Sequence, residues 1–164
     1  MFELKPLSKE AIPAALAKAE RYRLLDEPGE AESICLDILS TDPENQRALV
    51  TLLLALTDRF ATGHSIEPTE VQAILPRLKS EYERVYYAGV ICERRAKAGL
   101  RLSIPRFNAF ERFREAMAFY ERAEELHQPG NDDAVLRWNA CARFIMQHHL
   151  TESAPEDTPE LGLE

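Results

Sequence analysis

Two short patterns of ionisable residues are the part of this sequence that could do chemistry. Glu124 and His127 form an E-x-x-H pair, a spacing with which helical bundles bind two metal ions, but those bundles use two copies and further glutamates. His148 and His149 end a helical pattern, where the helix dipole favours a cation. The sequence has no zinc-protease, phosphate-loop, dinucleotide-binding or serine-hydrolase motif. It therefore predicts no catalytic residue, no metal ligand, no cofactor and a protein that is not an enzyme.

Three cysteines are placed where a packed helix would bury them. Cys35, Cys92 and Cys141 are odd in number, far apart and each set in an apolar helical pattern, which predicts free thiols in the core. The N-terminal residues lack the basic flank and apolar run of a signal peptide. The longest apolar run, residues 48–56, is too short to span a bilayer. These features predict a cytoplasmic protein with no membrane association.

Negative charge dominates the sequence but is concentrated at its end. The formal net charge is -8, which argues against generic binding to nucleic acid or anionic membranes. Residues 151–164 contain five Asp and Glu residues and no Lys or Arg, so they account for five of these eight charges. With two prolines and few apolar residues, this stretch is predicted to be a disordered tail that follows a folded domain of residues 1–150.

A cluster of positive charge, which we call the basic edge, lies between residues 94 and 114. Seven Lys and Arg residues there oppose one acidic residue, Glu111. The cluster is interpreted either as a solvated helix edge or as a docking site for an acidic partner, a phosphorylated segment or the acidic tail. Phe107, Phe110 and Phe113 are interleaved with these cations, as in RNA-binding surfaces, but their helical spacing favours the core. The candidate binding residues of the basic edge are Arg94, Arg95, Lys97, Arg101 and Arg106; Arg112 and Arg114 complete it.

The elements that must carry these residues are predicted to be helices alone. Apolar residues recur at helical spacing, and no stretch shows the strict alternation of a strand. Ser8 and Asp42 are expected to cap helices, with Pro43 at a first helical position, and Ser80 with Glu83 fits a capping box. The fold class is therefore all-α, with about seven helices in antiparallel pairs. They are expected from Ser8 to Leu25, from Glu30, after Pro43, from Pro68 with a kink or an end at Pro76, from Ser80 to a loop at 99–106, from Phe107 and from Val135.

Two helical hairpins carry a recognisable spacing of small and aromatic residues. In the first hairpin, Ala19 is followed by Tyr22, Ala31 and Pro43; in the second, Ala116, Tyr120 and Ala123 keep an A-x3-aromatic-x2-A pattern. This spacing resembles the tetratricopeptide repeat, a helix-turn-helix of about 34 residues. Cys35 and Ile38 stand where the family has Phe and Ala, the family's Trp and Leu are absent, and the middle of the chain departs from the period. The last helix, with Trp138, would close the stack.

The resemblance implies a module that binds another protein or peptide. Stacked hairpins curve, and the first helix of each pair lines a concave groove. No Lys or Asn falls at the mapped groove positions, which argues against the family members that clamp acidic C-terminal peptides in this way. We expect a monomer or weak homodimer, and an alternative function is a nucleic-acid-handling or catalytic protein that uses the basic edge. The groove positions carried over from the family are Leu16, Glu20, Arg23, Arg47, Val50, Leu54, Tyr86, Val90, Glu93, Leu136, Ala140 and Arg143.

Overall fold

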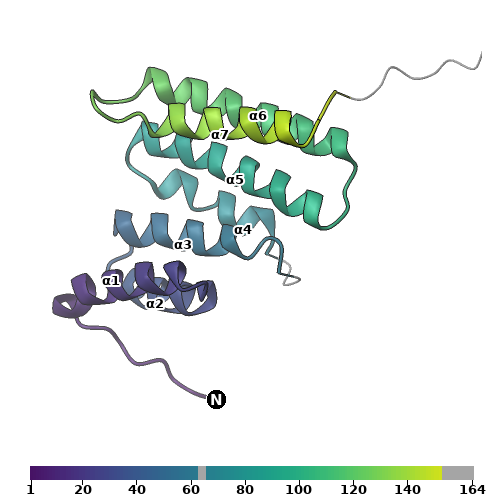
Figure 1. The fold of residues 1–164 in the computed structure, drawn as a ribbon. Coiled ribbons are helices and arrows are strands. Elements are labelled where there is room, and N and C mark those ends of the chain that lie inside the picture. The colour runs from purple at the N-terminus through teal and green to yellow at the C-terminus, as the bar shows by residue number, and fades with distance from the viewer. Residues whose placement is uncertain (63–65, 153–164) are drawn as a thin grey trace, which may run out of the picture.

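Seven α-helices and two 3-10 turns form the part of the chain that the structure describes, a computed structural model covering residues 1–62 and 66–152 (Figure 1). No strand occurs within these ranges, so the predicted all-α class is confirmed. The predicted tail lies outside the described residues from 153 onward. The helices are α1 (Ile12–Leu24), α2 (Pro28–Thr41), α3 (Gln46–Asp58), α4 (Pro68–Gln72), α5 (Glu81–Arg101), α6 (Arg106–Glu125) and α7 (Asp133–Gln147), with 3-10 turns at Lys9–Ala11 and Leu75–Arg77.

Most helix boundaries follow the local signals, and two predicted caps are wrong. The Ser80 hydroxyl accepts a hydrogen bond from the Glu83 amide at 3.2 Å, and Pro76 lies in a 3-10 turn after α4 has ended. Asp42 does not cap α3, because residues 42–45 first form a turn; the Asn45 side chain is the cap and accepts from the Ala48 amide. Ser8 precedes only a 3-10 turn and makes no side-chain capping bond.

Helix α5 is longer than predicted, because it extends to Arg101, whereas the loop was expected to begin at residue 99. Ser103 then adopts the left-handed conformation with φ of 64°, and the Ile104 amide donates to the Gly99 carbonyl at 2.9 Å. This is the Schellman arrangement, normally made with glycine at the left-handed position. Asp26 after α1 and His149 after α7 also have positive φ and the same backbone bonds. Three helices are thus stopped sharply by residues other than glycine.

Helices α1 and α2, α2 and α3, α5 and α6, and α6 and α7 pack as antiparallel pairs. Helices α3 and α5 are joined through the short α4 and are parallel, so α1, α3, α5 and α7 run in one direction with their C-termini on the same side (Figure 1). One core cluster joins α1 to α4 and includes Ile91 of α5, and a second joins α5, α6 and α7. Leu54 and Tyr87 contact both clusters, so the junction of α3 and α5 connects the two halves. No helix within the described ranges combines the length and apolar character needed to cross a membrane.

A glycine sets the close approach of α5 and α6. A Cβ placed on Gly89 would lie 2.7 Å from Cε1 of Tyr120, which is fully buried between the helices. Only glycine therefore lets this ring pack flat against the α5 backbone. The close approach brings the Tyr120 hydroxyl within 2.7 Å of the Glu93 carboxylate, one turn further along α5.

Candidate partner-binding surface

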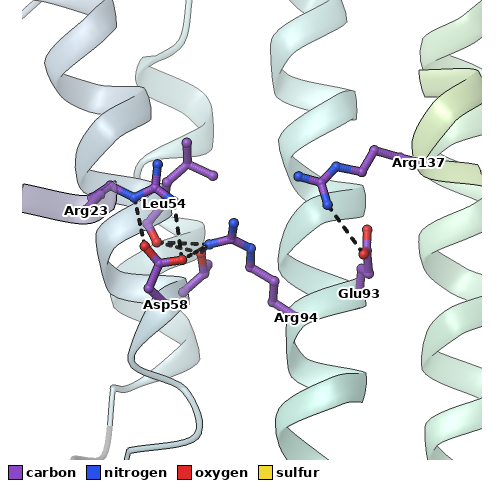
Figure 2. Close-up of polar contacts among 7 residues, drawn as sticks. Arg23, Leu54, Asp58, Glu93, Arg94 and Arg137 are labelled. Atoms are coloured by element: carbon purple, nitrogen blue, oxygen red, sulfur yellow. Dashed lines mark hydrogen bonds and ion pairs between the residues drawn. The ribbon is translucent and has the colours of Figure 1, made fainter. Parts of the chain in front are cut away.

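A carboxylate at the end of α3 ties three parallel helices together (Figure 2). Asp58 accepts hydrogen bonds from Arg23 of α1, with Nε at 2.7 Å, and from Arg94 of α5. Arg94 also donates to the Leu54 carbonyl at 3.1 Å and to the Thr57 hydroxyl at 2.8 Å. Burial lowers the pKa of Arg94, and the charge of Asp58 opposes that effect. We call this group the Asp58 cluster; it connects the two halves of the fold at the α3–α5 junction.

A second carboxylate, Glu93, lies in the core between α5, α6 and α7. Its side chain is 1% exposed and accepts hydrogen bonds from Lys97 Nζ at 2.6 Å and from the Tyr120 hydroxyl at 2.7 Å. Arg137 of α7 completes the group, with Nη1 at 3.5 Å (Figure 2). Burial by itself would raise the pKa of Glu93, but the hydrogen bonds and the two cations outweigh burial and lower the pKa. We call this group the Glu93 cluster.

The Glu93 cluster is fully partnered, which suits a structural role. Burial, followed by the charge of Glu93, raises the pKa of Tyr120 far above its usual range, so this phenol acts as a hydrogen-bond donor. Arg137 and Lys97 neutralise the carboxylate from two different helices. Within the described ranges, no group of three or more His, Cys, Asp or Glu residues could hold a metal ion. At the exposed end of α6, the Nδ1 atom of His127 contacts the backbone carbonyl of Glu124.

The groove positions carried over from the repeat family do not form one surface. Leu16, Val90 and Glu93 are buried in the core, because the helices bury a second stripe as well as the first. Contacts within the protein therefore occupy these three side chains, and their expected placement on a groove surface is corrected. The remaining positions are divided between half-buried residues, namely Glu20, Arg23, Val50, Leu54, Tyr86 and Ala140, and exposed ones, namely Arg47, Leu136 and Arg143.

Several half-buried groove positions are also committed to internal contacts. Glu20 forms an ion pair with Arg47 at 2.7 Å across α1 and α3. Tyr86 stacks on Tyr82, with ring centroids 5.6 Å apart. Leu136 is 64% exposed on the outer face of α7, well separated in the chain from the other apolar positions. Among the groove positions on α1 and α3, only Arg47 is exposed, and the ion pair with Glu20 already occupies its side chain.

The structure separates the basic edge into cations that bond within the protein, which we call the inward group, and cations without such a bond among the described residues, which we call the outward group. Exposure does not divide them, since Arg95 and Arg112 are half-buried and Arg106 is exposed. Arg94 belongs to the Asp58 cluster, Lys97 belongs to the Glu93 cluster, and Arg106 donates to the carbonyl of His148. The outward group consists of Arg95, Arg101, Arg112 and Arg114, and none has a carboxylate within 4.0 Å in the part of the chain that is described. The partners of Arg94 and Arg106 come from distant segments, which sequence reasoning could not pair with them. The partner of Lys97 is Glu93, four residues away on the same helix, and this spacing was the one signal that the sequence offered.

Two adjoining hollows open where the end of α3 faces the C-terminal half of α5, and Phe60 and Ala98 line both. The first has a volume of about 210 Å³ and is bordered by Arg101 together with the Asp58 cluster. The second has a volume of about 200 Å³ and is bordered by Arg95 and Arg112. We call them the α3–α5 hollows. The wall of the second hollow is largely apolar and includes Ile66, Pro68, Leu102 and Ile104.

The α3–α5 hollows combine guanidinium donors with apolar wall. Guanidinium groups match carboxylates and phosphates in geometry and charge, and Leu102 beside them is 60% exposed. Larger hollows lie near Pro43 and near Pro129, about 580 and 650 Å³, but neither is lined by an arginine. Phe113 is fully buried and Phe110 half-buried, so these rings are core residues as predicted; nothing is described for the Phe107 side chain.

Around the partly apolar α3–α5 hollows, Arg101 is exposed, and Arg95 and Arg112 are half-buried. Comparison of the chain with protein-family models, with curated protein sequences and with solved structures finds no match in any of the three.

Proposed function

We propose that this protein is an interaction module that binds an acidic segment of a partner protein at the α3–α5 hollows. The observation that carries the proposal is the position of Arg95, Arg101 and Arg112. These three cations border the hollows and have no carboxylate within 4.0 Å among the described residues. In a protein of net charge -8, they form an outward-facing positive site.

The helices around the hollows are held in place before a partner arrives. Arg94 fixes α5 to the end of α3 through Asp58, and Lys97 is held by Glu93 in the core. Binding to a preformed surface avoids the entropy cost of ordering loops. Each charge-assisted hydrogen bond from an arginine to a partner carboxylate would contribute about 1.5 to 3 kcal/mol. An apolar side chain of the partner would bury its surface against Phe60 and Leu102.

A protein partner is favoured over nucleic acid by charge and by the aromatic residues. Nucleic-acid binding gains most of its affinity from neutralised phosphates, whereas this chain carries an excess of eight negative charges. Stacking on bases needs exposed rings, and Phe113 is fully buried. The repeat-like hairpins are consistent with a binding module and add no specific partner.

The test compares two double charge reversals in affinity capture from the native host, followed by direct binding to the purified partner. Arg101→Glu with Arg112→Glu reverses the surface, whereas Lys18→Glu with Arg21→Glu reverses the same charge on exposed positions of α1. We expect the first variant to lose the partner and the second to keep it. Equal capture by both variants would refute the proposal, and recovery of nucleic acid, with affinity falling steeply in salt, would replace the protein partner.

A further inference from the structure

We propose that the acidic segment of residues 151–164 binds the α3–α5 hollows of its own chain and competes there with the partner. The proposal uses the surface of the proposed function but does not depend on a partner being found. It assigns an occupant to the outward arginines from charge, from the place where the segment begins, and from its length.

Charge complementarity is the first argument. The segment carries Glu152, Glu156, Asp157, Glu160 and Glu164 with no Lys or Arg, which gives it five negative charges. Three arginines of the outward group, Arg95, Arg101 and Arg112, border the hollows and have no carboxylate partner in the described residues. Leu161 and Leu163 also provide apolar side chains of the kind that fit beside Leu102 and Ile104. The segment therefore has both properties that the surface would recognise.

The place where the segment begins is the second argument. The chain leaves α7 through His149, which has φ of 50°, and Leu150 is then buried in the core. Arg106, at the start of α6, donates to the carbonyl of His148 and fixes this exit to the corner between α5 and α6. The C-terminal ends of α3, α5 and α7 lie on the same side of the molecule (Figure 1). The segment thus starts on the side where the hollows open.

The length of the segment is the third argument. Its fourteen residues can span at most about 45 to 50 Å when extended. Axes of packed helices lie about 8 to 10 Å apart, so the way from the end of α7 to the cleft between α5 and α3 is well within reach. A tether of this length gives the segment an effective concentration on the order of millimolar at the surface. Even weak carboxylate–guanidinium contacts would then keep the surface occupied.

The test uses a spin label on the full chain. Burial raises the pKa of the three native cysteine thiols, Cys35, Cys92 and Cys141, to about 12, so at neutral pH a nitroxide reagent reacts preferentially with a cysteine of ordinary pKa introduced as Thr158→Cys. We expect paramagnetic broadening of the backbone amides of residues 95–102 and 60–62. Broadening should disappear in the Arg101→Glu, Arg112→Glu variant and persist in the Lys18→Glu, Arg21→Glu control.

A competition experiment gives the second readout. The five acidic residues of the segment are changed to their amides in the full chain, and a synthetic peptide of residues 151–164 is titrated. We expect this peptide to bind the neutralised chain about tenfold more tightly than the wild-type chain, in which the tethered segment competes. Equal affinities, or broadening that the charge reversal leaves unchanged, would overturn the proposal. If the Arg101→Glu, Arg112→Glu variant loses the partner but the spin label causes no broadening in the wild-type chain, the tail proposal is overturned and the proposed function stands. If the label causes broadening that the charge reversal removes, but no partner is captured, the tail proposal stands and the proposed function is overturned.

Discussion

Changing Glu93 to Gln tests whether the buried carboxylate stabilises the fold. The substitution keeps the size of the side chain but removes the charge that Lys97 and Arg137 neutralise. Breaking a fully buried ion pair costs about 3 to 5 kcal/mol, because a charge is left without compensation. Here the side chains of Lys97 and Arg137 keep 38% and 36% exposure, so water screens them and the cost must be reduced. We expect a loss of about 2 kcal/mol in the free energy of unfolding.

The assay is urea denaturation at pH 7, followed by circular dichroism, with thermal unfolding as a second measurement. For a chain of this size, a loss of about 2 kcal/mol lowers Tm by about 4 to 8 °C. Tyr120→Phe removes the hydroxyl that donates to Glu93, and the double variant gives the coupling between them. An unfolding free energy for Glu93→Gln that equals the wild-type value, with an unchanged denaturant slope, would refute the reasoning.

The pH dependence gives an independent check on the same residue. The pKa of Glu93 is lowered from its ordinary value of 4.5: burial alone would raise it, but the bonds from Lys97 and Tyr120 prevail. A carboxyl whose folded pKa is lowered contributes stability that is fully present above its unfolded pKa and is lost as pH falls through the folded pKa. The difference between wild type and Glu93→Gln should therefore be constant from pH 6 to 8, values well above 4.5, and shrink in acid. A difference that grows in acid would contradict the assigned direction.

Three further substitutions have expected outcomes. Gly89→Ala places a Cβ 2.7 Å from the Tyr120 ring, so overpacking of about 1 to 3 kcal/mol should exceed the helix-propensity gain of up to about 1, with a lower urea midpoint. Ser103→Gly relieves the left-handed backbone at the end of α5 and should stabilise by about 1 kcal/mol; an unchanged or lower Tm would contradict this. Arg94→Gln should weaken the Asp58 cluster by about 1 to 2 kcal/mol and speed hydrogen exchange at the α3–α5 junction, while exchange at α6 stays as in wild type.

Local signals were sufficient to predict the helices, because helical periodicity depends on residues three and four positions apart. The predicted capping bond of Ser80 is confirmed for the same reason, whereas the helix that begins at Pro68 ends at Gln72, before Pro76 is reached. The error at Asp42 shows the limit of such signals. Two residues able to cap, Asp42 and Asn45, lie three apart, and the Asn45 amide bonds to the Asp42 carboxylate, so the turn between them delays the start of α3.

The candidate site was less predictable, because it depends on contacts between distant segments. Asp58 and Arg94 are 36 residues apart, and Glu93 and Tyr120 are 27 apart, so no local pattern pairs them. The sequence therefore indicated a basic edge without showing which cations were already neutralised. Burial of Glu93 was also hidden, since a glutamate on a helix is ordinarily assigned to the exposed face.

The inward and outward cations of the basic edge belong to one physical arrangement. The parallel helices α1, α3, α5 and α7 bring their C-termini, which carry partial negative charge, to one side of the molecule. Arg23 and Arg101 lie in the last turns of α1 and α5, where they balance that charge, and Arg94 closes the junction on Asp58. Arg95, Arg101 and Arg112 make no internal ion pair within the described ranges. They border the α3–α5 hollows, as does Arg94, whose charge is neutralised by Asp58. The proposed binding surface for acidic segments would thus be a consequence of how the helices are aligned, whether the segment comes from a partner or from the chain itself.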